Sequence, residues 1–404
     1  DDCEYTAIDD RSMPYLTSDP QGAWVRFTNG QLSTPLCSPS RSVQMRGQRA
    51  DHSLHISNLQ PPAGYSYTAH IGKWVSDVAG ATAAYAGKHL NGFPWSAIGT
   101  YHPLGWDRLY INGLNTYTDP DYYDQTDALL TPTGYSTDLL SAEAVSFLST
   151  VVEPFLLVVH PDAPHAPMTP AARHSAVDAG GATSADDPPE WDAQIVDAPD
   201  HMVLAALSTA DKDEFRARRA DARRCLLAVD EMIEAVIDEL VAQGMLATTA
   251  IFFYNDNGNS LGRCRIGTSS SSNKQRPYNW CQNMNLRVRW PGQSNRTEER
   301  LVSHTDIVPT LAAILGATPT LAQDGIDIRP LLDDTATTWR SSVESCWLGE
   351  VDQPGVPDWW SVVWRARNGA IQWRYTEYDT AEVELFDDVA DPDNLVNVAA
   401  ANSA

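Results

Sequence analysis

The sequence predicts an α/β fold in which helices cover both faces of a mostly parallel sheet. Two short apolar runs, at residues 155–159 and 249–254, have the length of buried strands. An amphipathic segment at residues 212–245 separates them, as a helix that joins parallel strands would. Polar residues follow both runs, with His160-Pro161 after the first and Asn255-Asp256 after the second. Because ligands bind at the carboxyl ends of strands in such sheets, we expect a site at this edge.

The helices are predicted from apolar spacing and from the residues that end them. The segment at 212–245 carries apolar side chains three and four residues apart, and Gly244 closes it. A second helix is predicted at residues 306–315, after a loop sequence. Both helices are expected to pack their apolar faces on the sheet.

The C-terminal part of the chain differs in composition, because it is rich in tryptophan and its pattern predicts strands. Strands are predicted at residues 362–367 and 370–375, joined by Asn368-Gly369, which is a strong hairpin signal. We therefore expect a catalytic domain at residues 1–335 and a small C-terminal α+β subdomain with an antiparallel sheet at residues 336–404.

The composition is that of a globular chain with an acidic surface. The 404 residues include 28 basic and 53 acidic side chains, which gives a formal net charge of -25, and 43% of the residues are hydrophobic. A surface of this sign repels nucleic acid and anionic lipid, so neither is expected as a partner. No apolar run approaches the roughly 20 residues that a membrane span requires.

The cysteines are too few for a disulfide scaffold in a chain of this length. Cys264 and Cys281 flank a polar, serine-rich stretch and are the pair that we expect to form a disulfide. Cys225 lies in the predicted long helix and is expected to be a buried thiol.

Five short motifs carry the residues that could do chemistry. Residues 37–41 read Cys-Ser-Pro-Ser-Arg, and they are followed by Gly87-Lys88, by Pro-His-Ala-Pro at 164–167, by Asp-Asn-Gly at 256–258 and by Lys274. The chain contains four lysines, and two of them lie in these motifs, which indicates that an ammonium group is needed there. Each motif alone has an ordinary structural reading, such as a buried cysteine or a turn after a strand. Their occurrence together, in the order that resembles a known enzyme family, favours a catalytic site.

This ordered set resembles the signature of the type I sulfatases, in the branch that contains N-acetylglucosamine-6-sulfatases and arylsulfatases. The resemblance covers most of the chain and implies an alkaline-phosphatase-like α/β fold. It also implies that the first strand, which would lead into Asp1 and Asp2, is missing and that the sequence is trimmed at its start.

The resemblance assigns a role to each motif residue. Cys37 would be converted to formylglycine by a formylglycine-generating enzyme, and the hydrate of that aldehyde would attack sulfur. Arg41 would orient the hydrate, while Lys88 and Lys274 would contact the sulfate or leaving oxygen. His165 would protonate the departing alcohol. Leu90 stands where many relatives have histidine, which leaves the second proton donor near Lys88 open.

The same resemblance predicts one bound calcium ion. Asp1, Asp2, Asp256 and Asn257 would supply oxygen ligands, and residue 37 would complete the set after its conversion. Hard, mostly anionic oxygen donors suit Ca²⁺ better than zinc.

The predicted function is hydrolysis of sulfate monoesters, either aryl sulfates or small sulfated sugars, through a covalent sulfo-enzyme intermediate. Two alternatives stay open at this point. One is a phosphomonoester or phosphonate hydrolase on the same fold, and the other is a non-catalytic binding protein with Cys37 unmodified. A secreted, periplasmic or lysosomal-like location is expected from the resemblance.

Overall fold

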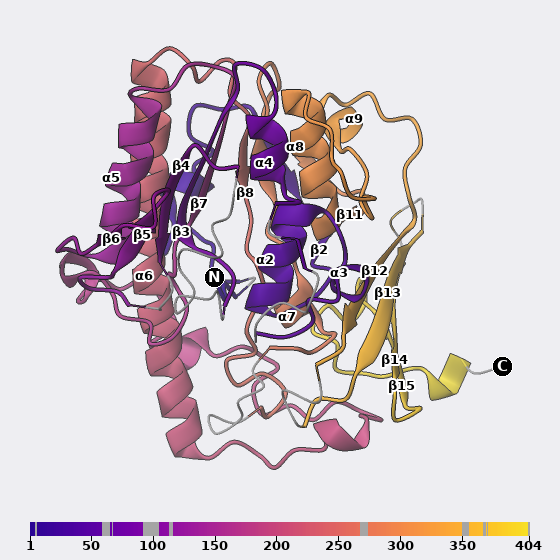
Figure 1. The fold of residues 1–404 in the computed structure, drawn as a ribbon. Helices are drawn as coiled ribbons and strands as arrows, with labels where there is room; N and C mark the ends of the chain where they lie inside the picture. Colours follow the sequence, from indigo (N-terminus) through magenta and orange to yellow (C-terminus); the bar gives the residue numbers. More distant parts are fainter. Residues whose placement is uncertain are drawn as a thin grey trace.

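The fold is taken from a computed structural model (Figure 1), which describes residues 1–4, 6–58, 65–66, 68–91, 105–112, 116–266, 274–349, 355–366, 369 and 371–402. A five-stranded sheet has the order β6-β5-β4-β3-β7. Its strands are β3 (Thr82–Lys88), β4 (Arg108–Asn112), β5 (Tyr122–Asp124), β6 (Leu129–Leu130) and β7 (Phe155–His160). β3 lies parallel to both β4 and β7, whereas β5 and β6 run antiparallel. β7 confirms the first predicted strand.

A second, four-stranded sheet has the order β10-β1-β9-β8. Its strands are β1 (Trp24–Phe27), β8 (Ile251–Phe253), β9 (Arg287–Arg289) and β10 (Arg296–Glu298), and β8 confirms the second predicted strand. β1 and β10 are parallel, but β9 runs antiparallel to both of its neighbours. A two-stranded parallel sheet pairs β2 (Gly30–Gln31) with β11 (Val302–Ser303).

The helices lie on both sides of the strands, which confirms the predicted α/β class (Figure 1). α5 (Ser136–Leu148) and α6 (Thr209–Ala242) cover one side, and α2 (Cys37–Arg46), α4 (Ile71–Ser76) and α8 (Ile307–Leu315) cover the other. The short helices are α1 (Pro14–Thr17), α3 (Ala50–Ser53), α7 (Asn279–Gln282) and α9 (Arg329–Leu332). Among the described residues, none of these helices combines the length and the apolar character that crossing a bilayer would need.

Both predicted helices are found, as α6 and α8. α6 begins after Ser208, whose hydroxyl accepts a hydrogen bond from the Asp211 backbone N–H at 3.1 Å, while the Asp211 carboxylate accepts one from the Ser208 N–H. This reciprocal capping satisfies backbone donors that a helix start leaves open. α8 ends at Gly316, whose φ of 68° is a left-handed conformation that glycine adopts without strain.

The five-stranded sheet and the four-stranded sheet that contains β8 approach each other at β7 and β8. An apolar cavity of about 440 Å³ is lined by both strands and by side chains from α6 and α8. Asp1 and Cys3 line it together with the residues that follow the carboxyl ends of β7 and β8. Within the described residues β7 pairs with β3 alone and β8 with β9 alone. The predicted strand before Asp1 stays a prediction.

The C-terminal sheet is antiparallel throughout, as predicted. It consists of β12 (Ser342–Trp347), β13 (Trp359–Arg365), β14 (Gln372–Tyr378) and β15 (Val383–Asp387) in that order. β13 and β14 form the expected hairpin, but their ladder ends at Arg365 and Gln372, and an Ala366 N–H to Ile371 C=O bond of 3.0 Å follows. The connection is therefore longer than the predicted two-residue turn. Asn368 lies outside the described residues, and the domain boundary at residue 335 stays a prediction.

The expected disulfide between Cys264 and Cys281 is wrong. All of the cysteines are buried as thiols, including Cys225 in α6, which confirms the prediction for that residue. Cys264 and Cys281 pack in an apolar cluster with Ile266 and Trp280. A thiol behaves there as a small hydrophobic side chain, so a serine-rich connection between two cysteines is not sufficient to indicate a bond.

Glu384 in β15 makes the C-terminal sheet sensitive to pH. Tyr278 and Tyr378 donate hydrogen bonds to its carboxylate oxygens at 3.0 and 2.6 Å, and Glu384 has no exposed surface. Burial outweighs these hydrogen bonds and raises the pKa of Glu384 from 4.5 to about 7. The pKa of Glu384 is higher in the folded chain than in the unfolded chain. Its contribution to the free energy of unfolding is therefore fully present below the unfolded pKa of 4.5 and is lost as the pH rises through about 7.

We expect Glu384→Gln to remove this pH dependence, because the amide cannot ionise. Between pH 4.5 and pH 8 the native chain should lose about 3 kcal/mol more free energy of unfolding than the variant, measured by urea unfolding. Glu377→Gln, at an exposed position of β14, is the matched control and should follow the native chain. Parallel curves for the native chain and Glu384→Gln would contradict the prediction.

Candidate active site

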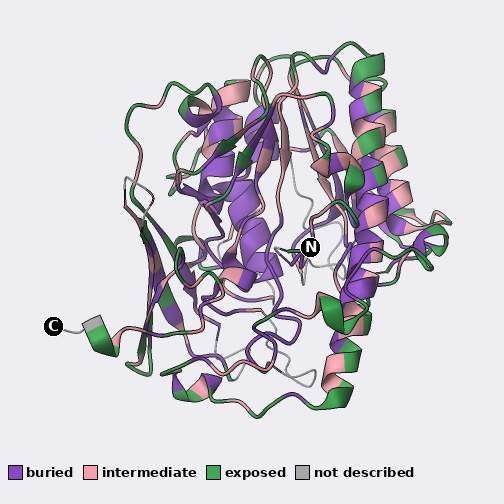
Figure 2. Cartoon of the chain, turned by 180° about the vertical axis from the view of Figure 1, so that it is seen from behind, coloured by how far each residue is buried: buried purple, intermediate pink, exposed green. Residues whose placement is uncertain are grey.

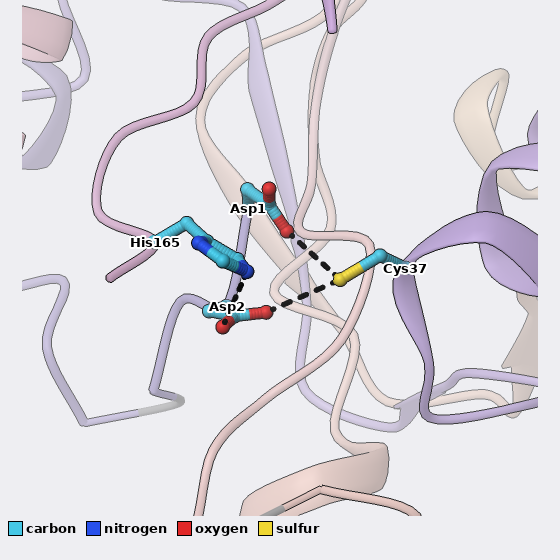
Figure 3. A group of neighbouring side chains, drawn as sticks. All are labelled: Asp1, Asp2, Cys37 and His165. Atoms are coloured by element: carbon cyan, nitrogen blue, oxygen red, sulfur yellow. Dashed lines mark hydrogen bonds and ion pairs between the residues drawn. The ribbon is translucent and has the colours of Figure 1, made fainter. Parts of the chain in front are cut away.

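Cys37 occupies the first position of α2, and the helix presents it to the N-terminal residues. Every residue of α2 is buried, and Figure 2 shows this helix in the interior of the molecule. The Cys37 Sγ donates to Asp1 Oδ1 at 3.3 Å and to Asp2 Oδ1 at 3.6 Å (Figure 3). A helix N-terminus favours negative charge, so this position suits a group that becomes anionic during a reaction. Arg41 lies one turn later on the same face.

The Asp1-Asp2 pair and the Asp256-Asn257 pair, which are distant in sequence, form one cluster. The Asp2 backbone N–H donates to Asp256 Oδ1 at 3.1 Å, and Asn257 Nδ2 donates to Asp2 Oδ1 at 2.8 Å. Asp256 and Asn257 follow β8, which brings them to the edge where the sequence predicted a site. Asp2 adopts a left-handed φ of 58°, which is uncommon for a residue with a side chain and turns the chain sharply at the cluster.

Three cationic side chains surround these carboxylates. Lys88 Nζ lies 2.5 Å from Asp1 Oδ2, and Lys274 Nζ contacts Asp2 Oδ1 and lies 3.0 Å from the Cys37 Sγ. The Arg41 guanidinium lies 3.2 Å from Asp256 Oδ2 and 3.5 Å from Asp1 Oδ2. Buried charges of both signs therefore balance one another, as buried ions must.

The pKa values follow from burial and these pairings. Burial acts to raise the pKa of Asp2, but the charges of Lys274 and His165 outweigh it and the pKa is lowered. Burial also acts to raise the pKa of Asp256, but the charge of Arg41 opposes it and the pKa is lowered. Both carboxylates are therefore ionised at neutral pH. Burial raises the pKa of the Cys37 thiol, against the attraction of Lys274, so an unmodified cysteine here is held as a thiol.

His165 reaches the cluster from the loop after β7. Its Nδ1 lies 2.6 Å from the Ala166 carbonyl oxygen, to which it donates, and its Nε2 lies 3.6 Å from Asp2 Oδ2 (Figure 3). Burial lowers the pKa of His165 to about 4, although Asp2 opposes this shift. The ring is therefore neutral at pH 7, and it would have to gain a proton before it could donate one to a leaving group.

Sequence reasoning missed His160 and Tyr85 as partners of Arg41. Arg41 Nη1 donates to the His160 Nδ1 at 3.1 Å and to the Lys88 carbonyl oxygen at 2.9 Å. The Tyr85 hydroxyl lies 2.7 Å from the same His160 nitrogen. Burial and Arg41 lower the pKa of His160, which leaves its Nδ1 available as an acceptor. The position of His160 at the carboxyl end of a predicted strand was the one available signal.

The oxygen donors of Asp1, Asp2, Asp256 and Asn257 fit a hard divalent cation. Asp1, Asp2, Cys37 and His165 offer ligand atoms that all lie within 4.8 Å of one another (Figure 3). The Asn257 Oδ1 is buried and accepts no hydrogen bond from the part of the chain that the structure describes. An orphaned buried acceptor next to three carboxylates is the arrangement that a calcium ion would satisfy.

All of the residues predicted for the site lie together in this one cluster: Asp1, Asp2, Cys37, Arg41, Lys88, His165, Asp256, Asn257 and Lys274. Their individual catalytic and metal-binding roles stay predictions. The arrangement places a buried side chain at a helix start next to fixed cations and carboxylate oxygens, which suits the binding of a tetrahedral anion.

Comparisons with known proteins show the family and the fold of this chain. The family model described as Sulfatase matches residues 6–317. The N-acetylglucosamine-6-sulfatase of Bos taurus is 27% identical over 92% of this chain and 74% of its own length. The solved complex of BT4656 with its substrate D-glucosamine-2-N,6-O-disulfate superposes with a TM-score of 0.76 at 20% identity, covering 98% of this chain and 91% of that one. The phosphonate monoester hydrolase of Agrobacterium radiobacter superposes with a TM-score of 0.68 at 18% identity, covering 98% and 88%.

Proposed function

Because the chain belongs to the sulfatase family, we propose that this sulfuric ester hydrolase cleaves sulfate monoesters of small sugars through a formylglycine at position 37 and a bound calcium ion. The observation that carries the proposal is the placement of the Cys37 Sγ between Asp1, Asp2 and the Lys274 ammonium.

The chain's own residues supply the charge that the reaction needs. A sulfate ester brings negative oxygens into a site that already holds carboxylates, so fixed cations must offset the repulsion. Lys88 and Lys274 point their ammonium groups into the cluster and would bind the sulfate oxygens. Arg41, fixed by His160, would hold the group at position 37 in its attacking orientation. These cations act in a buried site, where electrostatic attraction is stronger than in water.

Asp1, Asp2, Asp256 and Asn257 would hold the calcium ion, whose chemistry is to neutralise and polarise oxygen atoms bound to it. The formylglycine would supply an aldehyde carbon that can carry a hydroxyl nucleophile, and a formylglycine-generating enzyme would be the partner during maturation. His165 would exchange a proton at its Nε2, on the side that faces Asp2.

The sugar substrate class is supported by the relatives. The bovine relative is named for N-acetylglucosamine 6-sulfate, and the substrate in the BT4656 complex is a sulfated glucosamine. The net charge of -25 favours a small sulfated sugar over a long sulfated chain, because an acidic surface repels a polyanion. A secreted, periplasmic or lysosomal-like location would bring the protein into contact with such sugars.

Two measurements test the proposal. Mass analysis of the peptide that contains Cys37 is expected to detect an aldehyde in place of the thiol. Hydrolysis of p-nitrophenyl sulfate is expected to be faster than that of p-nitrophenyl phosphate, because the two substrates share their leaving group and differ in the transferred anion. Faster hydrolysis of the phosphate would indicate the phosphatase alternative, and an intact thiol with no turnover would indicate a binding protein.

A further inference from the structure

The residue that follows Lys274 is tied to the C-terminal sheet. The Gln275 backbone carbonyl accepts a hydrogen bond of 2.8 Å from the indole N–H of Trp359, the first residue of β13. Gln275 also has a left-handed φ of 62°, so its backbone needs external contacts to hold this conformation. Trp359 has no exposed surface and Gln275 is only 2% exposed, so this hydrogen bond is buried and its loss would leave a buried polar group without a partner.

The same tryptophan lies beside the segment that leads into Cys37. The Gln275 N–H donates to the Pro35 carbonyl at 3.2 Å, which joins the two catalytic segments directly. Leu36, between Pro35 and Cys37, belongs to a buried apolar cluster with Trp359 and its sheet neighbours Trp347 and Tyr378. The loop that carries Lys274 and the start of α2 therefore rest on one end of the C-terminal sheet.

We propose that Trp359 is a positioning residue, through which the C-terminal sheet sets the distance between the Lys274 ammonium and the reactive group at position 37. The sheet fixes Trp359 by ladder pairing with Trp347 on one side and Tyr378 on the other. Its indole N–H then fixes Gln275, and the neighbouring Lys274 Nζ comes to 3.0 Å from the Cys37 Sγ. The expected change in kcat rests on the proposed function. The expected change in the distance between Lys274 Nζ and residue 37 does not, because it holds for any reaction at this site.

The substitution Trp359→Phe tests this role, because phenylalanine keeps an aromatic ring in the cluster and loses the N–H. Since a displacement of about 1 Å at a catalytic group can cost roughly 100-fold, we expect kcat for p-nitrophenyl sulfate to fall by about 10-fold or more. Trp364→Phe is the matched control, because Trp364 lies on the same strand with 41% of its surface exposed. The control should retain native kcat, and all rates are measured well below each melting temperature.

A double-mutant cycle separates positioning from general weakening of the fold. If Trp359 acts through Lys274, then Trp359→Phe should have little further effect on kcat in a chain that already carries Lys274→Met. A purely structural role would instead give additive losses. Additive losses, or an unchanged kcat in the single variant, would overturn the proposal.

A crystal structure of Trp359→Phe provides a readout that does not depend on turnover. We expect Gln275 and Lys274 to shift and the contact between Lys274 Nζ and residue 37 to lengthen from 3.0 Å, while the control leaves it unchanged. An unmoved Lys274 would refute the positioning role even if the native chain proved to hydrolyse no sulfate ester. Absent turnover together with a displaced Lys274 would instead refute the proposed function and leave this inference standing.

Discussion

Replacing Cys37 by alanine is expected to lower sulfate ester hydrolysis by roughly 10⁴-fold or more, which is the scale seen when a covalent nucleophile is removed. Alanine cannot be converted to formylglycine, so the site would lose its attacking group while Lys88, Lys274 and Arg41 remain in place. The measurement is kcat/KM for p-nitrophenyl sulfate at saturating calcium. Substrate binding that persists while turnover falls by this factor is the expected outcome.

Folding should survive this substitution, because the Cys37 side chain is small and α2 is buried along its whole length by other contacts. A melting temperature close to that of the native chain would establish this. Cys225→Ala is the matched control, since Cys225 is equally buried but lies in α6 among apolar side chains. Cys225→Ala should retain activity. Near-native turnover by Cys37→Ala would show that some other residue is the nucleophile.

The site residues were predicted mainly from the ordered motif set and its resemblance to a known family, and only part of the set also follows from predicted strand ends. His165 lies in the loop after β7 and Asp256 follows β8, the two strands predicted from apolar runs, so the fold class brings these two residues to one edge. These positions depend on local apolar patterns, which a single sequence carries. Asp1, Asp2, Cys37, Lys88 and Lys274 follow no predicted strand, and the family resemblance of the whole motif set added them.

Contacts between segments far apart in the chain could not be predicted in the same way. The bond from Trp359 to Gln275 spans 84 residues, and the contact of Arg41 with His160 spans 119, with no local pattern for either. The same limit explains the wrong disulfide, because bonding depends on the distance and direction between two thiols rather than on the loop between them. The two predicted strands β7 and β8 lie in different sheets, and this too depends on which strands pair in space.

Asp256→Asn and Lys274→Met are expected to separate calcium binding from catalysis. Asp256 would be a direct ligand, and its carboxylate also accepts the Asp2 N–H that fixes the second acid. Removing its charge should weaken calcium binding by roughly 10- to 100-fold or more, because ligands and their hydrogen-bonded partners both set metal affinity. Activity should fall with it and recover partly when the calcium concentration is raised.

Lys274→Met should have the opposite pattern. Its ammonium contacts Asp2 and repels a nearby divalent ion, so its removal should leave calcium affinity unweakened, as measured by titration calorimetry. The kcat/KM for p-nitrophenyl sulfate should nevertheless fall by roughly 10²- to 10³-fold, since a fixed cation would no longer meet the sulfate charge in the transition state. Raising the calcium concentration should not restore it. If calcium affinity fell as far in Lys274→Met as in Asp256→Asn, Lys274 would be holding the metal pocket together rather than acting on the substrate.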